Sequence, residues 1–325
     1  MKVNDRCVGL LSNYDVEVLR TAKGRGAILC ETNLGLLIFK EYIGRKNKVA
    51  LQSEILSTLH RENIKAEQII PNKEGEFLTT DYDGSVYILK TYSTGRECII
   101  KDVGDCQKAV QSLAALHNVP TEELCIPEGS VQGACINEYE KHTRELRKIR
   151  KYLLNRGQKT DFEILLLQNY DYFYLQAAEV FEQMNLSGED FTIKRICHGD
   201  YQYHNILFEE ENTFLINFEK CFIEDVTRDL GLFLRKILEK NFWNEEMGFS
   251  LLEAYEEVRT LTQEEKLQLY RRLSYPEKFW KIANFYYNTG KSWIPGKNIE
   301  KLYKLLEQEN EKKAFLKRYQ EVYLA

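Results

Sequence analysis

A short stretch of the chain carries side chains suited to moving a phosphate group. Residues 197–205 read CHGDYQYHN, and residues 214–219 read FLINFE. Enzymes that transfer phosphoryl groups use an aspartate to orient the acceptor hydroxyl, an asparagine five residues later to bind a metal ion, and an aspartate on the next strand to hold the metal on the nucleotide phosphates. Asp200 and Asn205 fit the roles of catalytic base and metal ligand. Asn217 stands where the third carboxylate is expected.

The amide of Asn217 changes what this stretch can do with a metal ion. Mg²⁺ prefers anionic oxygen ligands, and an amide oxygen is neutral. Losing about 3–4 kcal/mol of transition-state stabilisation would slow the reaction roughly a hundred- to a thousandfold. Glu219 lies two residues further on and points to the same face if the strand is regular. It is either a substitute metal ligand or a polar residue at a strand end, and both interpretations stay open.

Positions near the N-terminus could bind the nucleotide phosphates. Lys40 ends the third strand-like run, and Glu54 follows on a predicted helix, so we expect them to form the lysine–glutamate pair of a phosphate site. Gly24, Arg25 and Gly26 form a turn between two strands, where backbone amides could cover the phosphates. An ordinary hairpin explains the two glycines equally well.

A small sheet must precede a larger helical region to position these residues. The predicted strands cover residues 16–19, 27–30, 35–40, 76–80 and 86–92. The apolar spacing in residues 49–59 predicts one helix among them. From Asp105, a candidate N-cap, the pattern turns helical. A hairpin of residues 205–208 and 214–217 interrupts this helical pattern and carries Asn205 and Asn217 at its ends.

This order of elements predicts an α+β, bilobal, protein-kinase-like fold. A small antiparallel sheet lobe of nucleotide-binding type would comprise residues 1–94. A larger, mostly helical lobe with the catalytic-type loop would comprise residues 95–325. Only nine residues separate Glu219 from Asp229. This spacing leaves no room for the activation loop of a protein kinase and indicates the layout of small-molecule kinases.

Composition narrows the classes of partner. The net charge of -5 and the pI near 5.8 give no overall basic field, so we expect no nucleic-acid partner. No apolar run approaches the roughly 20 residues that cross a bilayer, so we expect no membrane segment and a soluble intracellular protein. The eight cysteines are scattered without the spacing of zinc ligands, so we expect reduced thiols. Later cross-linking of these cysteines stays open. The basic helix over residues 143–152 is either a solvated face or a surface for an acidic partner or substrate.

Taken together, these motifs resemble the CotS-type spore-coat proteins, and in particular their clostridial branch. The resemblance spans nearly the whole chain. That family lies within the aminoglycoside and choline phosphotransferase superfamily, which has a protein-kinase-like fold. Its specific parts are residues 23–32, 95–98, 113–117, 197–200 with Asn205, 229–236 and 275–284.

The resemblance implies roles for single residues. It makes Asp200 the base, Asn205 a magnesium ligand, Lys40 the phosphate lysine and Glu54 its partner. Asn217 departs from the superfamily's metal-binding aspartate.

It also implies a place in the cell. We expect synthesis in the cytoplasm of the sporulating mother cell, then deposition in the spore coat, with coat proteins as partners. The leading hypothesis is a pseudokinase or very weak phosphotransferase in coat assembly, with ATP and Mg as candidate ligands. The alternative is an active ATP-dependent small-molecule kinase whose acceptor is unknown. A third hypothesis is a vestigial cleft that binds neither nucleotide nor metal.

Overall fold

The chain folds into two compact units. The computed structural model describes residues 9–24, 26–121, 124, 135–187, 194–289 and 295–325. The first unit contains residues 1–132, 193–233 and 254–259, and the second contains residues 133–192, 234–253 and 260–325. The lobe boundary expected at residue 94 falls inside the first unit and stays a prediction.

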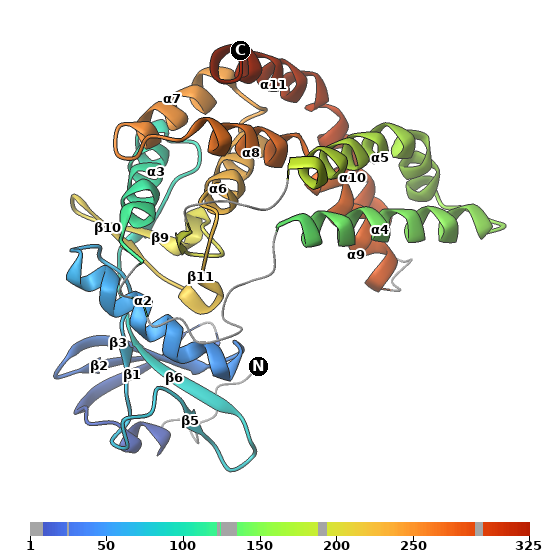
Figure 1. Ribbon diagram of the computed structural model, residues 1–325. Helices are drawn as coiled ribbons and strands as arrows, with labels where there is room; N and C mark the ends of the chain where they lie inside the picture. The colour runs from blue at the N-terminus through green and yellow to red at the C-terminus, as the bar shows by residue number, and fades with distance from the viewer. Residues whose placement is uncertain (1–8, 25, 122–123, 125–134, 188–193, 290–294) are drawn as a thin grey trace. The chain divides into compact units, whose positions relative to one another are not determined.

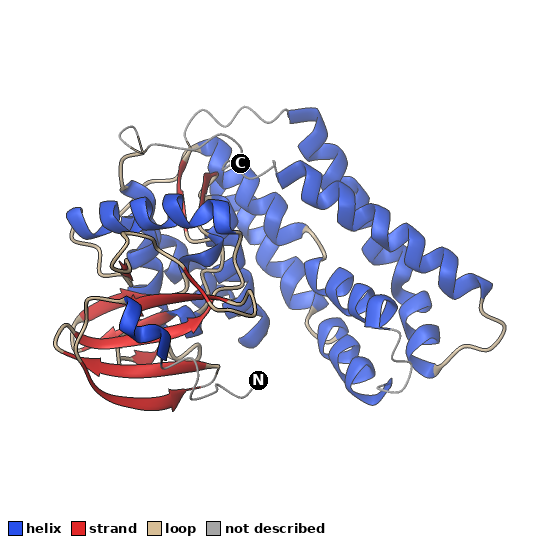
Figure 2. Cartoon of the chain, turned by 90° about the horizontal axis from the view of Figure 1, so that it is seen from below, coloured by secondary structure: helices blue, strands red, loops and turns tan. Residues whose placement is uncertain are grey.

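The N-terminal part of the first unit is a six-stranded antiparallel sheet (Figures 1 and 2). Its strands are β1 (Val18–Gly24), β2 (Ala27–Thr32), β3 (Gly35–Glu41), β4 (Ile69–Ile70), β5 (Thr79–Thr80) and β6 (Val86–Thr91). The spatial order is β1-β2-β3-β6-β4, with β5 also paired to β6. One helix, α2 (Val49–Arg61), interrupts the strands as the sequence predicted. The short helical turns η1 (Leu10–Asn13) and η2 (Lys46–Lys48) precede β1 and α2.

The two faces of this sheet have different chemistry. Alternate residues of a strand point to opposite faces. Leu37, Phe39 and Leu89 are buried on one face together with Tyr14, whose ring meets Phe39 edge to face. The register that pairs Phe39 with Leu89 puts Lys40, the next residue of β3, on the opposite face. The apolar face therefore anchors the strands, and the other face presents the lysine to the site.

The rest of the first unit carries the catalytic-type segment. Strands β7 (Arg96–Glu97), β9 (Ile206–Glu209) and β10 (Asn212–Leu215) form one small sheet, and β8 (Arg195–Cys197) pairs with β11 (Phe222–Glu224). The turns η3 (Tyr203–Asn205) and η4 (Phe218–Lys220) flank the β9–β10 hairpin, which confirms the predicted hairpin. Helix α6 (Thr227–Lys240) begins in this unit and ends in the second.

Helix α3 (Val103–Asn118) begins earlier than the sequence predicted. Its N-cap is Asp102, whose side chain accepts a hydrogen bond from the backbone N–H of Asp105 at 2.8 Å. The prediction that Asp105 is the N-cap is therefore wrong. The carboxylate of Asp105 instead accepts a hydrogen bond from the Arg96 guanidinium, with Oδ1 2.8 Å from Nη2.

In the described residues the second unit is helical (Figure 1). Its helices are α4 (Cys135–Asn155), α5 (Asp161–Ser187), α7 (Glu245–Glu256), α8 (Gln263–Ser274), α9 (Glu277–Thr289), α10 (Pro295–Leu306) and α11 (Glu309–Tyr323), with the end of α6. The last turn of α7, from Ala254, belongs to the first unit. Leu146 of α4, Leu166 of α5, Phe279 of α9 and Leu302 of α10 are fully buried in one apolar core. The sheet-then-helices order agrees with the predicted α+β class.

The basic helix predicted over residues 143–152 is the second half of α4. Arg147 and Arg150 are exposed to solvent and lie over the rings of Tyr174 and Tyr170 of α5, at 5.7 Å and 5.3 Å from the ring centroids. Guanidinium groups stack favourably on aromatic faces. This surface is solvated, and an acidic partner for it stays a prediction.

Two further expectations concern thiols and membranes. Cys30, Cys98, Cys106, Cys197 and Cys221 are buried free thiols. Cys7 and Cys125, and the side chain of Cys135, lie outside the described residues. Within the described helices, none combines the length and apolar character that would let it cross a bilayer.

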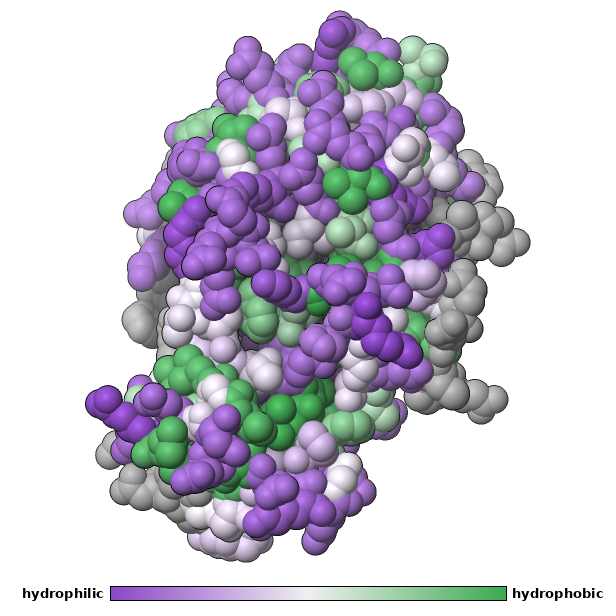
Figure 3. All heavy atoms as spheres, turned by 90° about the vertical axis from the view of Figure 1, so that its left-hand side faces the viewer, coloured by the Kyte–Doolittle hydropathy of each residue, from purple (hydrophilic) through white to green (hydrophobic). Residues whose placement is uncertain are grey.

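On the face shown in Figure 3, hydrophobic side chains gather in the lower part of the view, at the height of the N-terminal sheet in Figure 1.

Candidate functional site

Asn205 and Asn217 meet at the ends of the β9–β10 hairpin. Asn205 directly precedes β9 and Asn217 lies two residues after the end of β10, so the pairing of the two strands brings them together. The Nδ2 of Asn217 donates a hydrogen bond of 2.8 Å to the Oδ1 of Asn205. The Nδ2 of Asn205 donates to the backbone carbonyl of Asp200, also at 2.8 Å. The structure thus brings three predicted site residues together.

Lys40 fixes the orientation of the Asn217 amide. The Nζ of Lys40 donates to the Oδ1 of Asn217 at 3.0 Å. An ammonium group can only donate, so the amide oxygen faces Lys40 and the amide NH₂ faces Asn205. Asn217 has φ +68°, in the left-handed region that asparagine tolerates better than most residues. As a result, both asparagine oxygens already accept hydrogen bonds within the protein.

A second lysine joins Lys40 in a buried ion cluster. The Oε1 of Glu219 lies 2.7 Å from the Nζ of Lys40 and 2.8 Å from the Nζ of Lys90. Lys90, whose side chain is 1% exposed, also contacts the Oε2 of Glu67 at 2.7 Å. The other oxygen of Glu67 accepts the backbone N–H of Phe218 at 2.9 Å. Two cations and two carboxylates therefore compensate one another; Lys90 and Glu67 are buried, and Lys40 and Glu219 are 21% and 15% exposed.

The pKa values of the cluster follow from this balance. Burial alone would raise the pKa of Glu219, but the charges of Lys90 and Lys40 outweigh it and hold that pKa at about 2. Burial would lower the pKa of Lys90, but Glu67 and Glu219 raise it above its ordinary value. Lys40 differs, because burial and the nearby charge of Lys90 lower its pKa. Glu219 is thus a fixed anion of the cluster.

Asp200 lies on the catalytic-type loop with a cation beside it. Its Oδ2 is 2.8 Å from the Nζ of Lys220, and its Oδ1 accepts a hydrogen bond from Gln202. Burial raises the pKa of Asp200, but the hydrogen bonds from Lys220 and Gln202 outweigh burial and lower it overall. Lys220 is 67% exposed, and exposed ion pairs contribute only about 0–1 kcal/mol. Asp200 can therefore exchange this partner for another at little cost.

Buried hydrogen bonds hold the loop that carries Asp200. Asp229 accepts the backbone N–H of His198 at 2.5 Å and that of Gly199 at 3.0 Å. The Nε2 of His198 lies 2.9 Å from the carbonyl oxygen of Ile216, and its Nδ1 accepts the backbone N–H of Asp200. The carbonyl requires a donor, so the Nε2 of His198 carries the proton. His198 and Asp229 therefore hold the loop in place through hydrogen bonds.

Gly199 shows how closely the loop packs. Its φ is +81°, and a Cβ there would lie 2.0 Å from the carbonyl oxygen of Lys220. A side chain at this position would displace the backbone that carries Asp200.

The other predicted residues that the structure describes lie at the first strands and on α2. Gly24 ends β1, and Gly26 follows with φ +72°, in the turn before β2. Arg25 lies outside the described residues. Glu54 is half-buried on α2, but the carboxylate that pairs with Lys40 is that of Glu219. The predicted Lys40–Glu54 pair is thus replaced, because the η4 turn folds Glu219 towards β3 and β6.

Sequence reasoning missed Lys90 and Glu67. Lys90 interrupts the apolar run of β6, and a lysine within such a strand is a signal that its charge has a buried partner. Glu67 precedes β4 and has no motif around it. Only the register of β3 against β6 shows that Lys90 lies on the same face as Lys40.

The residues at the expected metal position do not fit Mg²⁺ as they stand. Its ligands must present free, preferably anionic, oxygen atoms in octahedral geometry. The oxygens of Asn205 and Asn217 accept hydrogen bonds from Asn217 and Lys40, and the Oε1 of Glu219 is shared by two lysines. Each of these oxygen atoms already has an internal partner that a metal ion would have to displace or share.

Comparison with known proteins identifies the family. A family model described as "Spore coat putative kinase YutH" matches residues 9–319. The chain belongs to this family. Spore coat protein S of Bacillus subtilis (strain 168) is 22% identical over 330 residues, which cover 97% of this chain and 93% of that protein. The resemblance to spore-coat proteins of kinase fold is confirmed.

Solved structures confirm the fold of this family member. An aminoglycoside phosphotransferase from Alicyclobacillus acidocaldarius has a TM-score of 0.82 at 17% identity, covering 96% of this chain and 94% of that chain. The spectinomycin phosphotransferase APH(9)-Ia, solved with ADP and spectinomycin, has a TM-score of 0.69 at 14% identity, covering 97% and 98%. The predicted fold of aminoglycoside phosphotransferase type is therefore correct.

Proposed function

We propose that this spore-coat kinase-family protein is a pseudokinase that does not catalyse magnesium-dependent phosphoryl transfer. One observation supports this most directly. The amide of Asn217 connects Lys40 to Asn205, so the positions that would hold the metal are joined to each other by hydrogen bonds. An aspartate at position 217 could not donate to Asn205. The asparagine therefore suits a closed site, by which we mean one in which Asn217 is hydrogen-bonded to Lys40 and Asn205 and no metal is bound.

Glu219 does not readily replace the missing aspartate. Moving its carboxylate to a metal ion would leave Lys90 paired with Glu67 alone. It would also break the ion pair between Lys40 and Glu219. Breaking a buried pair costs about 3–5 kcal/mol. A metal ion would have to recover that free energy before it stabilised the transition state.

Nucleotide binding is a separate part of the proposal. The structural neighbours include spectinomycin phosphotransferase solved with ADP and with AMP. In this chain, Lys40 is the cation that could meet the nucleotide phosphates, beside the turn of Gly24 and Gly26. Because the metal position is closed, we propose that ATP binds without Mg²⁺ and that the protein acts through binding. Its partners would be other coat proteins, met in the mother-cell cytoplasm and then in the coat.

ATP turnover tests the proposal. Wild type is compared with Asn217→Asp and Asp200→Ala in the presence of Mg²⁺. We expect no turnover in wild type beyond that of Asp200→Ala, and a gain in Asn217→Asp. Robust wild-type turnover that Asp200→Ala abolishes would refute the pseudokinase.

The alternative function, an active ATP-dependent small-molecule kinase, is favoured by the state of Asp200. Its loop is held by Asp229 as a catalytic loop must be, and its partner Lys220 is exposed and easily displaced. In that case Glu219 and Asn205 would hold the metal. The same turnover assay separates the two functions, because only the alternative expects wild-type activity.

A further inference from the structure

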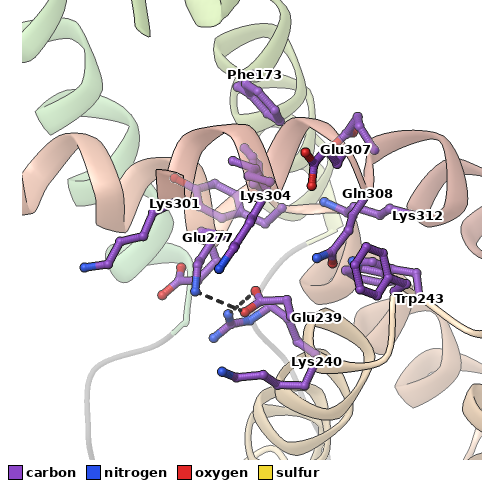
Figure 4. A pocket seen from close by; sticks show the side chains of 17 residues that line it. Phe173, Glu239, Lys240, Trp243, Glu277, Lys301, Lys304, Glu307, Gln308 and Lys312 are labelled. Carbon is purple, nitrogen blue, oxygen red and sulfur yellow. Dashed lines mark hydrogen bonds and ion pairs between the residues drawn. The ribbon is translucent and has the colours of Figure 1, made fainter. Parts of the chain in front are cut away.

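The second unit contains a cavity whose lining includes none of the residues Lys40, Asp200, Asn205 and Asn217. Its volume is about 570 Å³, within the range of about 300–1,000 Å³ that is typical of small-molecule sites. It lies where the ends of α6 and α10 meet the starts of α9 and α11, with Phe173 of α5 on another side (Figure 4).

Lys312 is a buried cation in the wall of this cavity. The residue is 7% exposed, and its Nζ donates to the backbone carbonyl of Ser274 at 3.2 Å. The same Nζ lies 5.5 Å from the centre of the Trp243 ring. Among the described residues, no carboxylate reaches ion-pair distance of Lys312, and burial lowers its pKa. An ammonium has three donors, so a buried lysine with one hydrogen bond is incompletely satisfied.

Two of the four carboxylates that line the cavity form ion pairs with cations other than Lys312. Glu239 accepts from Arg235 at 2.7 Å and lies 3.6 Å from Lys278. Glu277 is 2.9 Å from Lys281. The charges of Glu309 and Glu239 act on Lys312 and oppose the effect of burial on its pKa, but among the described residues neither forms an ion pair with it.

The lining as a whole has an excess of positive charge. Six cationic side chains and four carboxylates line it. The cations are Arg235, Lys240, Lys278, Lys301, Lys304 and Lys312. Figure 4 shows Lys304 of α10 pointing towards Glu239, Lys240 of α6 below Glu239, and Lys301 further along α10. A rim of this sign attracts anions.

The wall beside Lys312 is apolar. Figure 4 shows Trp243 next to Lys312, and Phe173 on the far wall. Phe242 and Leu305 add to this surface. Aromatic walls bind flat apolar groups, and a few placed polar groups then fix the orientation of the ligand.

We propose that this cavity is a binding site for a small organic anion that carries a ring. The carboxylate or phosphate of the ligand meets Lys312, and its ring packs against Trp243. The acidic group completes the hydrogen bonds of the buried ammonium, and the lysines of the rim steer the anion to the entrance. This inference is independent of nucleotide binding.

Phenyl phosphate serves as the probe, measured by isothermal titration against the full chain. The titration is carried out in the Lys40→Met background, so that phosphate binding at Lys40 does not contribute to the signal. We expect phenyl phosphate to bind at least tenfold more tightly than inorganic phosphate or phenol, because each of these has only half of the recognised features. Lys312→Met should weaken binding at least tenfold, the range for a hydrogen bond to a charged group. The matched control is Lys317→Met, an exposed lysine of the same helix, and should leave binding unchanged.

A second measurement locates the ligand without changing a buried residue. In ¹⁵N-tryptophan-labelled protein, phenyl phosphate should shift the Trp243 indole N–H resonance, and Lys304→Glu at the exposed rim should weaken binding severalfold. Equal affinity for phenyl phosphate, inorganic phosphate and phenol would overturn the proposal. So would an unshifted Trp243 resonance at saturation, or full binding in a folded Lys312→Met variant.

Discussion

Replacing Asn217 with aspartate should turn a closed site into a metal site. The new side chain keeps an oxygen towards Lys40, at the 3.0 Å contact seen now, and can adopt the same left-handed backbone. It loses the N–H that Asn217 donates to Asn205 at 2.8 Å. Two acceptor oxygens then face each other across that distance, one of them on a carboxylate. This is the arrangement that a divalent cation binds.

The size of the effect follows from these contacts. Losing the hydrogen bond and leaving the Asn205 oxygen unsatisfied costs about 1–3 kcal/mol, of which the stronger contact with Lys40 offsets a part. Without metal, Asn217→Asp should therefore melt roughly 2–5 °C below wild type. At a hundredfold excess over its Kd, Mg²⁺ would restore about 2.7 kcal/mol. Wild type, with the position closed, should not respond.

The assay is thermal unfolding of each protein in EDTA and in Mg²⁺. The matched control is Asn212→Asp, which adds the same charge at the exposed start of β10. It should behave as wild type in both buffers. This account of the site would be refuted if Mg²⁺ did not change the melting temperature of Asn217→Asp. It would also be refuted if Mg²⁺ raised the melting temperature of wild type as much as that of the variant.

Two further predictions concern the ion cluster. Lys90→Met leaves Glu67 and Glu219 without their shared cation, and should lower the free energy of unfolding by about 3–5 kcal/mol in urea denaturation; Lys46→Met, at an exposed site, is the control, and equal stability of the two variants would contradict the cluster. The pKa of Glu219 is held at about 2, below its ordinary value of 4.5, so its ion pairs stabilise the fold fully above pH 4.5 and this contribution is lost as the pH falls towards 2. Glu219→Gln should accordingly show a weaker loss of stability than wild type between pH 5 and pH 3, and parallel pH profiles would exclude the depressed pKa.

The sequence was sufficient for the fold and for the proximity of the residues in the loop and hairpin. Asp200, Asn205 and Asn217 could be predicted because they lie within one hairpin and its loop, where spacing along the chain determines proximity. Glu219 was left between two roles, and the structure shows why. Residues 217–220 are a left-handed residue and a helical turn instead of a regular strand, and this turns Glu219 to the lysines.

The long-range partners could not be predicted from spacing. Lys40 was expected to pair with Glu54, because both positions were counted along the chain. The ion cluster instead joins β3, β6, the segment before β4 and the η4 turn, and its members depend on strand register. A single sequence does not show that Lys90 and Lys40 share a face, or that Glu67 reaches them.

The direct test of the central claim is a titration of wild type with Mn²⁺ and ADP, followed by electron paramagnetic resonance of the free ion. We predict that ADP binds while the protein adds no Mn²⁺ binding beyond that of ADP in solution. Asn217→Asp, measured beside it, should add one bound ion. A tight Mn²⁺ site in the wild-type complex would contradict the account, because it would require the hydrogen bond between Asn217 and Asn205 to open at little cost.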